Sequence, residues 1–448
     1  MLYYFTVSNF LSVADELSLD LFPYGRLRNK KSHIYATGPV NVLKAGTIYG
    51  GNGSGKSNLV RAMAFLRNFV VANSTLLGSR TIEGFRFDDK QLQEPSKFEI
   101  EFNTGNQSYR YAVALRAYHV ESESLYVTTP EEEDREPELL FSRTRAGKEV
   151  EVAMNARFQV TEEDRARISI YVKELLKNSE SLLHLLAGND AFPDLRPAFD
   201  WFVNNFIIIE PDTRLMNLAE ALERDVQFKQ MADTLLQSLD TGVQQISLYT
   251  TDYDSLFGFD EPEQKQEVLK QLADGAPYVK LFFNGELVLA KLQKDRLLVS
   301  RVTTPHEVAG KQMMFFPEEE SDGTRRVLDF LPLWHLLFSQ NATVMIDEIG
   351  RSLHPNLVEQ LLRVFLEGDT RGQLLFTTHD ANLLQRDLFR RDEVWLMEKN
   401  DEGASRITPL TDFKIRDDLD LRKSYLNGRF GGVPQLRTFF AEDFAHHE

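Results

Sequence analysis

The sequence predicts an α/β fold in which a parallel sheet is combined with antiparallel strands and an inserted helical segment. First, a short strand-like run at residues 44–50 leads through a glycine-rich loop into residues 59–70, where apolar side chains recur at helical spacing. Second, short apolar runs alternate with helix-like runs in the last third of the chain, which is typical of strands joined in parallel. Third, residues 98–120 alternate apolar and polar side chains around a Thr-Gly-Asn turn, as antiparallel strands do.

The pattern also predicts the individual elements. Residues 3–22 are expected to form a hairpin, and the helical period dominates residues 161–239. Helices are expected at residues 171–188, 217–239, 357–366 and 381–389, strands at 342–346, 373–379 and 393–399, and further strands within 242–306. Pro332 is expected to kink the helix that follows an acidic loop near residue 320.

Composition limits the class of protein. The chain has 448 residues, enough for two or three domains or for one large domain with an insertion. A net charge of −17 argues against broad attraction to nucleic acid, although a local basic groove is compatible with it. The lack of cysteine excludes disulfide bonds and thiolate metal sites. Because the sequence has neither a signal-like start nor an apolar run approaching about 20 residues, we expect a cytoplasmic protein with no membrane partner.

The glycine-rich loop fits the pattern G-x-x-x-x-G-K-[ST], in which backbone amides curl around phosphate oxygens at the start of a helix. The residues expected to bind nucleotide here are Gly50, Gly51, Asn52, Gly53, Ser54, Gly55, Lys56, Ser57 and Asn58. Lys56 is expected to reach the β- and γ-phosphates of ATP, and Ser57 to hold Mg²⁺ through its hydroxyl. An ordinary glycine-rich turn is the alternative interpretation.

An acidic pair follows an apolar strand-like run in the segment TVMIDEIG. In the functional interpretation, Asp347 holds Mg²⁺ and Glu348 acts as the general base for the attacking water. The end of a parallel strand is where ligands bind in α/β folds, which favours this interpretation. The alternative is a surface acidic pair that caps the next helix.

Two further segments carry candidate residues. His379 ends the strand-like run QLLFTTH, where a γ-phosphate contact is expected, although a single histidine is more often structural. Ser321 is expected to cap the helix that begins near residue 324. Alternatively, Ser321 and the backbone of Gly323 grip a γ-phosphate that is bound to another subunit.

The order GGNGSGKSN, ESDGT, VMIDE and TTHD resembles the heads of ATP-binding-cassette ATPases, including the SMC and RecF type. NFLSV, IYGGNGSGKSN, ESDGTRR, IDEIGRSLHP, THDANLL, RDEVWLMEK and YLNGRFGGVPQL look like the stand-alone bacterial ATPases of abortive-infection defence, the RloA-like group. The resemblance implies that two heads sandwich two ATP molecules, with Ser321 and Gly323 completing the site of the partner. The glutamine that usually follows the second core strand has three candidates, Gln91, Gln93 and Gln107.

The resemblance also implies a division of the chain and a function. Residues 1–155 are expected to form an ATPase lobe with an antiparallel β subdomain, 156–305 a mainly helical insertion with some strands, and 306–448 the second ATPase lobe. The implied function is an ATP-hydrolysing switch in anti-phage defence that controls an effector, a nuclease or a toxin, encoded nearby. The partners would be a second copy of the chain, the effector, and a nucleic acid or phage protein. The alternatives are a recombination or repair ATPase that acts on DNA structures, a transport ATPase, and a scaffold that binds ATP without hydrolysing it.

Two features remain open at this level. His354 resembles the dimer-facing loop of the family, but it is equally compatible with a helix-start residue before Pro355. Basic residues gather near the C-terminus and form either a solvated face or a contact for nucleic acid or a partner; they are Arg416, Arg422, Lys423 and Arg429.

Overall fold

The computed structural model describes two compact units. It describes residues 1–36, 40–73, 76–77, 80–128, 136–147, 149–159, 161–188, 192–211, 213, 218–239, 241–258, 262–308, 310–416 and 419–433. Unit 1 comprises Met1–Pro211, Asn341–Ile349 and the chain from Gly372 onward, and unit 2 comprises Asp212–Gln340 and Gly350–Arg371.

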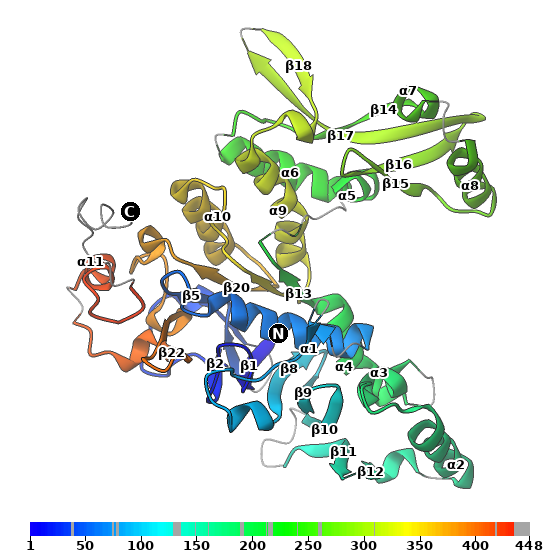
Figure 1. The fold of residues 1–448 in the computed structure, drawn as a ribbon. Helices are drawn as coiled ribbons and strands as arrows, with labels where there is room; N and C mark the ends of the chain where they lie inside the picture. Colours follow the sequence, from blue (N-terminus) through cyan, green and yellow to red (C-terminus); the bar gives the residue numbers. More distant parts are fainter. Residues whose placement is uncertain are drawn as a thin grey trace, which may run out of the picture. The chain divides into compact units, whose positions relative to one another are not determined.

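A six-stranded sheet with the order β13-β19-β20-β5-β21-β22 forms the centre of unit 1 (Figure 1). Its strands are β5 (Ala45–Tyr49), β13 (Phe206–Ile209), β19 (Thr343–Ile346), β20 (Gln373–Thr378), β21 (Val394–Lys399) and β22 (Ser405–Pro409). All neighbours run parallel except β21 and β22, which pair antiparallel. This arrangement confirms the predicted parallel α/β fold. The helix α1 (Lys56–Ala72) follows β5 after the glycine-rich loop and buries Leu59, Met63, Leu66 and Val70 as the periodicity predicts.

Unit 1 also contains a seven-stranded antiparallel sheet with the order β12-β11-β10-β9-β8-β1-β2. Its strands are β1 (Leu2–Ser8), β2 (Leu17–Asp20), β8 (Ser96–Thr104), β9 (Gln107–Arg116), β10 (His119–Thr128), β11 (Glu138–Ala146) and β12 (Glu149–Met154). The predicted N-terminal hairpin is confirmed, because β1 and β2 pair antiparallel. Aromatic stacking joins this sheet to the segment before β13: the rings of Phe102 and Trp201 lie 3.9 Å apart, and those of Trp201 and Phe206 lie 4.9 Å apart.

The predicted helix at residues 171–188 is wrong in its extent. The chain forms α2 (Glu162–Ile170), one π-helical turn at Tyr171–Leu175, and a separate short helix α3 (Leu182–Ala187), and α4 (Arg196–Asp200) follows. Glu123 of β10 accepts hydrogen bonds from the amides of Leu182 (2.8 Å) and Leu183 (3.1 Å) and from the Ser181 hydroxyl (3.0 Å). A distant carboxylate thus satisfies the first amides of α3, and the helix restarts there.

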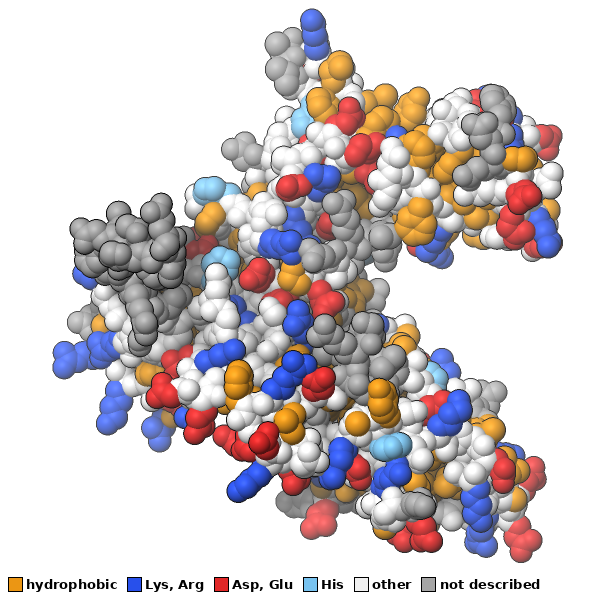
Figure 2. All heavy atoms as spheres, viewed as in Figure 1, with side chains coloured by type: hydrophobic (Ala, Val, Ile, Leu, Met, Phe, Trp, Pro, Cys, Tyr) orange, Lys and Arg blue, Asp and Glu red, His pale blue; other side chains and the backbone are white. Residues whose placement is uncertain are grey.

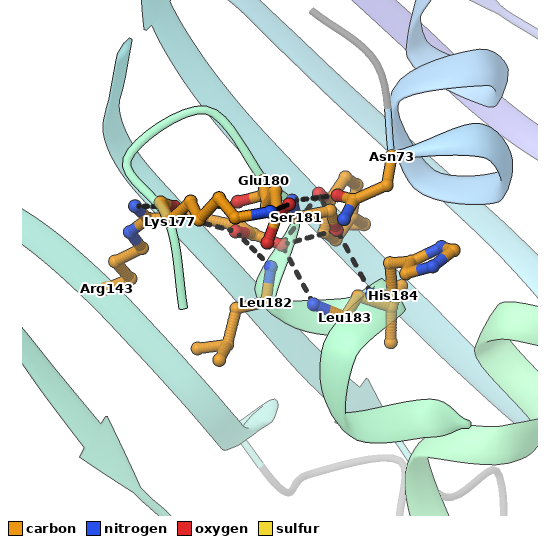
Figure 3. Close-up of polar contacts among 10 residues, drawn as sticks. Asn73, Arg143, Lys177, Glu180, Ser181, Leu182, Leu183 and His184 are labelled. Atoms are coloured by element: carbon orange, nitrogen blue, oxygen red, sulfur yellow. Dashed lines mark hydrogen bonds and ion pairs between the residues drawn. The ribbon is translucent and has the colours of Figure 1, made fainter. Parts of the chain in front are cut away.

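Figure 3 shows the polar network around this restart. Arg143 of β11 pairs with the buried Glu123 at 3.8 Å and donates to the carbonyls of Glu180 (2.7 Å) and Lys177 (3.0 Å). Asn73, which follows α1, accepts a hydrogen bond from the Ser181 amide at 2.7 Å. The network therefore ties the far end of α1 and the antiparallel sheet to α3.

Unit 2 combines helices with a second antiparallel sheet of the order β14-β17-β16-β15, and β18 pairs with β17. Its elements are α5 (Leu218–Arg224), α6 (Val226–Ser238), β14 (Ser247–Asp252), α7 (Tyr253–Phe257), α8 (Pro262–Ala273), β15 (Val279–Phe283), β16 (Glu286–Gln293), β17 (Arg296–Val308), β18 (Lys311–Phe315), α9 (Asp322–Ser339) and α10 (Pro355–Glu367). The predicted helix at 357–366 is confirmed as the body of α10. Pro332 lies inside α9, which continues to Ser339, and the kink stays a prediction.

Three further predictions need correction. The helix expected at 217–239 is two helices, because the Asp225 side chain accepts from the amides of Gln227 (2.8 Å) and Phe228 (3.0 Å) and caps α6. The helix expected at 381–389 is only a short 3-10 turn at Ala381–Leu383, which Asp380 caps. The strand region at 242–306 also contains α7 and α8. None of the helices in the described part of the chain is long and apolar enough to cross a membrane.

Candidate active site

The glycine-rich loop connects β5 to α1 and has an open outer side. Gly53 and Gly55 have left-handed backbones with φ of 78° and 107°, which glycine adopts at little cost. A Cβ atom added to Gly53 would meet nothing within 4 Å, whereas one added to Gly55 would overlap the Ser405 hydroxyl and lie 2.9 Å from Ser405 Cβ. The loop is therefore packed on one side and open on the other, and it ends at the positive N-terminus of a helix.

Hydroxyl groups hold the packed side of this loop. Ser405 Oγ donates to the Ser54 carbonyl at 2.9 Å and lies 2.7 Å from Ser12 Oγ. Asn58 Nδ2 donates to Ser12 Oγ at 2.7 Å, so this amide braces the start of α1. The nucleotide contact expected of Asn58 stays a prediction, as do those of Asn52, which is exposed, and Ser57, which is half-buried.

Lys56 is buried beside the loop that it belongs to. Its side-chain amine donates to the carbonyls of Gly50 (2.7 Å) and Gly51 (3.0 Å). Burial lowers the pKa of Lys56, and the negative charges of Glu348 and then Asp347 act in the opposite direction. Both acidic residues therefore lie within electrostatic reach of the lysine, although about 290 residues separate them in the chain.

The acidic pair follows β19, and one hydroxyl orders it. Asp347 is 3% exposed, and its Oδ1 accepts a hydrogen bond of 2.6 Å from Thr377 Oγ1. The same hydroxyl accepts one of 2.8 Å from the Glu348 amide. Glu348 has a φ of 53°, a left-handed conformation that non-glycine residues rarely adopt and that clusters at functional sites. Sequence reasoning missed Thr377, whose only signal was a hydroxyl residue in an apolar strand.

His379 follows β20 directly and is exposed. Because β20 lies between β5 and β19, the histidine leaves the sheet between the glycine-rich loop and the acidic pair. In the register of β20 and β5, Thr378 is opposite Tyr49, the last residue of β5 before the glycine-rich loop. This placement is compatible with the expected γ-phosphate contact, which stays a prediction.

Ser321 and Gly323 belong to unit 2. Ser321 is exposed and caps α9, because its hydroxyl accepts from the Thr324 amide at 3.1 Å. A Cβ atom added to Gly323 would lie 3.0 Å from the carbonyl oxygen of Ser352, in the loop before α10. Glu320, which precedes Ser321, forms hydrogen bonds with His306 Nε2 at 2.7 Å and with the Thr304 hydroxyl. The capping role of Ser321 is thus confirmed, and the contact with a second subunit stays a prediction.

The remaining candidates are His354, four basic residues and three glutamines. His354 caps α10 through its Nδ1, which accepts from the Asn356 amide at 3.2 Å, so the helix-start interpretation is confirmed. The four basic residues named above, Arg416, Arg422, Lys423 and Arg429, are all exposed, and Figure 2 shows basic side chains around this C-terminal part of unit 1. Of the three candidate glutamines, Gln91 and Gln93 lie in a 3-10 turn and Gln107 begins β9.

The fold and the site define a P-loop nucleotide-binding protein of the ABC-ATPase-head type. The profile of one protein family, described as "AAA domain, putative AbiEii toxin, Type IV TA system", matches residues 47–385, which is more than half of the chain. The chain belongs to this family, the abortive-infection group of ATPases. No curated protein matches the chain.

Three of the solved structures that match the chain are SMC heads. The crystal structure of an Smc head bound to the C-terminal winged-helix domain of ScpA is 12% identical, covers 91% of this chain and 97% of its own, and has a TM-score of 0.42. The SMC head domain from Thermotoga maritima is 11% identical, with coverages of 91% and 98% and a TM-score of 0.38. An Smc head with an extended coiled coil, bound to the C-terminal domain of ScpA from Pyrococcus furiosus, is 11% identical, with coverages of 92% and 98% and a TM-score of 0.40.

Proposed function

We propose that the protein is an ATP-binding and ATP-hydrolysing switch of a bacterial anti-phage defence system. ATP closes a dimer of heads, hydrolysis opens it, and the difference between the two states controls a partner effector in the cytoplasm. The observation that supports the proposal is that β5 and β19 both run parallel to β20 on either side of it, so the loop with Lys56 and the acidic pair Asp347 and Glu348 follow strand ends at the same edge of the sheet. The family description, which names an abortive-infection toxin, supports the role in defence.

The residues of the site fit ATP with Mg²⁺. Lys56 already binds two carbonyl oxygens, which phosphate oxygens can replace, and a glycine-rich loop before a helix suits phosphate through its backbone amides. Ser57 and Asp347 supply one hydroxyl and one carboxylate, the donors that Mg²⁺ uses together with phosphate oxygens and water. When bound, Mg²⁺ neutralises charge that develops on the β- and γ-phosphates.

Glu348 is the residue best placed to accept the proton of the attacking water. It is half-buried and next to the buried Asp347, and its amide is fixed by Thr377. Both carboxylates raise the pKa of Lys56, and the carboxylate of Glu348 has the larger effect. In this proposal Asp347 holds the metal, Glu348 takes the proton, and Lys56 stabilises negative charge on the transferred phosphoryl group.

The dimer is proposed from α9, the 18-residue helix whose exposed cap is Ser321. A helix N-terminus carries partial positive charge, which suits a phosphate of a second copy. Closure of the dimer would then depend on ATP. The γ-phosphate makes a contact with α9 of the second copy in the ATP-bound state, and this contact is lost after hydrolysis. The helices and the sheet of unit 2 would transmit this difference to the effector.

The test compares Glu348→Gln and Lys56→Ala with Glu263→Gln, a control at an exposed glutamate of α8. ATP turnover is measured by phosphate release, and subunit number by light scattering with and without Mg·ATP. We expect Glu348→Gln to bind ATP, to lose about 10²- to 10⁴-fold in turnover and to remain dimeric. Lys56→Ala should not bind ATP and should not dimerise when Mg·ATP is added.

The role in defence is tested in bacteria that carry the gene with its neighbours, by phage challenge. A switch predicts that Glu348→Gln locks or abolishes protection, whereas a scaffold that only binds ATP would protect as well as the wild type. Full turnover in both Glu348→Gln and Lys56→Ala would refute the assignment of the site.

A further inference from the structure

The chain after α11 (Leu421–Leu426) reaches the start of the glycine-rich loop within unit 1. The amide of Gly51 donates a hydrogen bond of 2.6 Å to the carbonyl oxygen of Gly432. A Cβ atom added to Gly432 would lie 3.7 Å from Gly50 Cα and 3.4 Å from the carbonyl oxygen of Met397 in β21. Two backbones nearly 400 residues apart are therefore in direct contact at the loop.

Two side chains fix the position of Gly432. Tyr425 donates its hydroxyl proton to the Gly432 carbonyl at 3.1 Å, and its ring lies edge-on to that of Tyr49 with centroids 6.0 Å apart. Glu398 of β21 accepts from the Gly432 amide at 3.0 Å. Gly431 has a φ of 73°, and a Cβ atom there would overlap the Glu398 carboxylate, at 2.9 Å from its Cδ. No larger residue fits at this point without displacing the carboxylate.

We propose that Tyr425, Gly431 and Gly432, named here the C-terminal clamp, position the phosphate loop and thereby set its affinity for nucleotide. The inference rests on the proposed function of the loop and assigns a part of the chain that this function leaves unused. Its residues are positioning residues, because they act through Gly51 and Glu398 and are not assigned a contact with the substrate.

The two ends of Gly51 explain how the clamp acts. Its amide is held by Gly432, and its carbonyl oxygen accepts from Lys56 at 3.0 Å. To bind phosphate, Lys56 must leave the carbonyls of Gly50 and Gly51, which then lose the partner that orders them. The clamp holds this backbone while the lysine changes partners. Without it, the ordering of the loop has to be supplied by nucleotide binding, so the affinity falls.

The clamp predicts a specific kinetic signature. It contacts the start of the loop and not the acidic pair, so its loss should weaken nucleotide binding and leave turnover at saturation unchanged. A residue that merely stabilises the fold would lower the unfolding temperature without moving the dissociation constant of folded protein. The two roles are therefore distinguishable by measuring both quantities in one set of variants.

The main comparison is Gly431→Ala with Gly428→Ala. Both glycines have left-handed backbones, with φ of 73° and 74°, so alanine strains both equally. A Cβ atom at Gly428 meets nothing within 4 Å, whereas one at Gly431 overlaps Glu398. Gly428→Ala thus controls for backbone strain in the same turn. Tyr425→Phe is the milder variant, because it removes only the hydroxyl and keeps the ring.

Full-length proteins are titrated with a fluorescent ATP derivative and Mg²⁺, and phosphate release is measured at saturating ATP. We expect the dissociation constant to rise about tenfold for Gly431→Ala and about threefold for Tyr425→Phe, as for one lost hydrogen bond, and to stay within about twofold for Gly428→Ala. Turnover at saturation should match the wild type in all three.

The inference is overturned if Gly431→Ala and Tyr425→Phe bind the probe as the wild type does, or if turnover falls while affinity is unchanged. If Gly431→Ala does not fold, Tyr425→Phe alone decides between these outcomes. Failure of the wild type to bind the probe would instead overturn the proposed function, and the inference with it.

Discussion

Replacement of Thr377 by valine should disable the acidic pair while it leaves the phosphate loop intact. The threonine is fully buried, and its hydroxyl makes two hydrogen bonds, at 2.6 Å to Asp347 and at 2.8 Å from the Glu348 amide. Valine has nearly the same shape, so the change removes the hydroxyl without opening a cavity. A buried carboxylate then lacks a donor, and a backbone amide lacks its acceptor.

The magnitude follows from these two contacts. A hydrogen bond to a charged group contributes about 1.5–3 kcal/mol and a neutral one about 0.5–1.5 kcal/mol, so the loss of stability should be about 2–4 kcal/mol. Misplacement of the general base by a fraction of an ångström to about 1 Å lowers turnover on the order of 10- to 100-fold. Nucleotide affinity should fall much less than turnover, because the hydrogen bonds of the Thr377 hydroxyl go to the acidic pair, whereas the phosphates are expected on the glycine-rich loop.

The assay is phosphate release at saturating Mg·ATP, together with nucleotide titration and thermal unfolding. Thr377→Ser is the matched control, because serine keeps the hydroxyl and loses only a methyl group. It should retain turnover within about threefold of the wild type. The reasoning is refuted if Thr377→Val turns over ATP as fast as the wild type, or if Thr377→Ser is as impaired as Thr377→Val.

Three further outcomes are expected. Gly55→Ala should abolish binding of a fluorescent ATP derivative, because the new methyl group would collide with Ser405. Gly53→Ala should only weaken binding, because its methyl group would point into open space, and equal affinities of the two variants would contradict this. Burial, and next the charge of a neighbouring glutamate, raise the pKa of Glu286 from 4.5 to about 7, so its contribution to stability is present at low pH and is lost as the pH rises through 7. Denaturant unfolding at several pH values should show a decline from about pH 5 to 8 in the wild type that is shallower in Glu286→Gln, and parallel curves would refute the assignment. Glu123→Ala should cost about 3–5 kcal/mol in thermal or denaturant unfolding, since it leaves a buried arginine unpaired, and a loss below about 1 kcal/mol would show that the network is dispensable.

The parts of the site that could be predicted from sequence are those built from adjacent residues. The loop around Lys56 and the pair Asp347 and Glu348 are each contiguous, and each follows an apolar run that could be identified as a strand. Parallel strands place such ends at one edge of the sheet, so their meeting was also predictable. The fold class followed from the same alternation of strands and helices.

The rest depends on partners that are far away in the chain. The helical period runs through residues 171–188, yet the helix restarts at α3, where Ser181 is a local cap and the first two amides of the helix find their acceptor in Glu123, from the antiparallel sheet. No local pattern indicates that partner. The break before α6 is different, because Asp225 is a common capping residue and stands next to the break, so this signal was available. The contact between Gly432 and Gly51 could not be predicted either, since nothing near Gly432 in sequence indicates it.

The acidic pair also shows why a motif alone does not define a site. In a continuing strand, the side chains of Asp347 and Glu348 would point to opposite faces of the sheet. Yet the negative charges of both act on Lys56 of the phosphate loop and raise its pKa. The left-handed backbone of Glu348 makes this possible, because the chain leaves the strand at Ile346 and turns, and Thr377 holds the turned amide. The conformation of the acidic pair therefore depends on a third residue, Thr377 of the neighbouring strand, whose hydroxyl donates to Asp347 and accepts from the Glu348 amide.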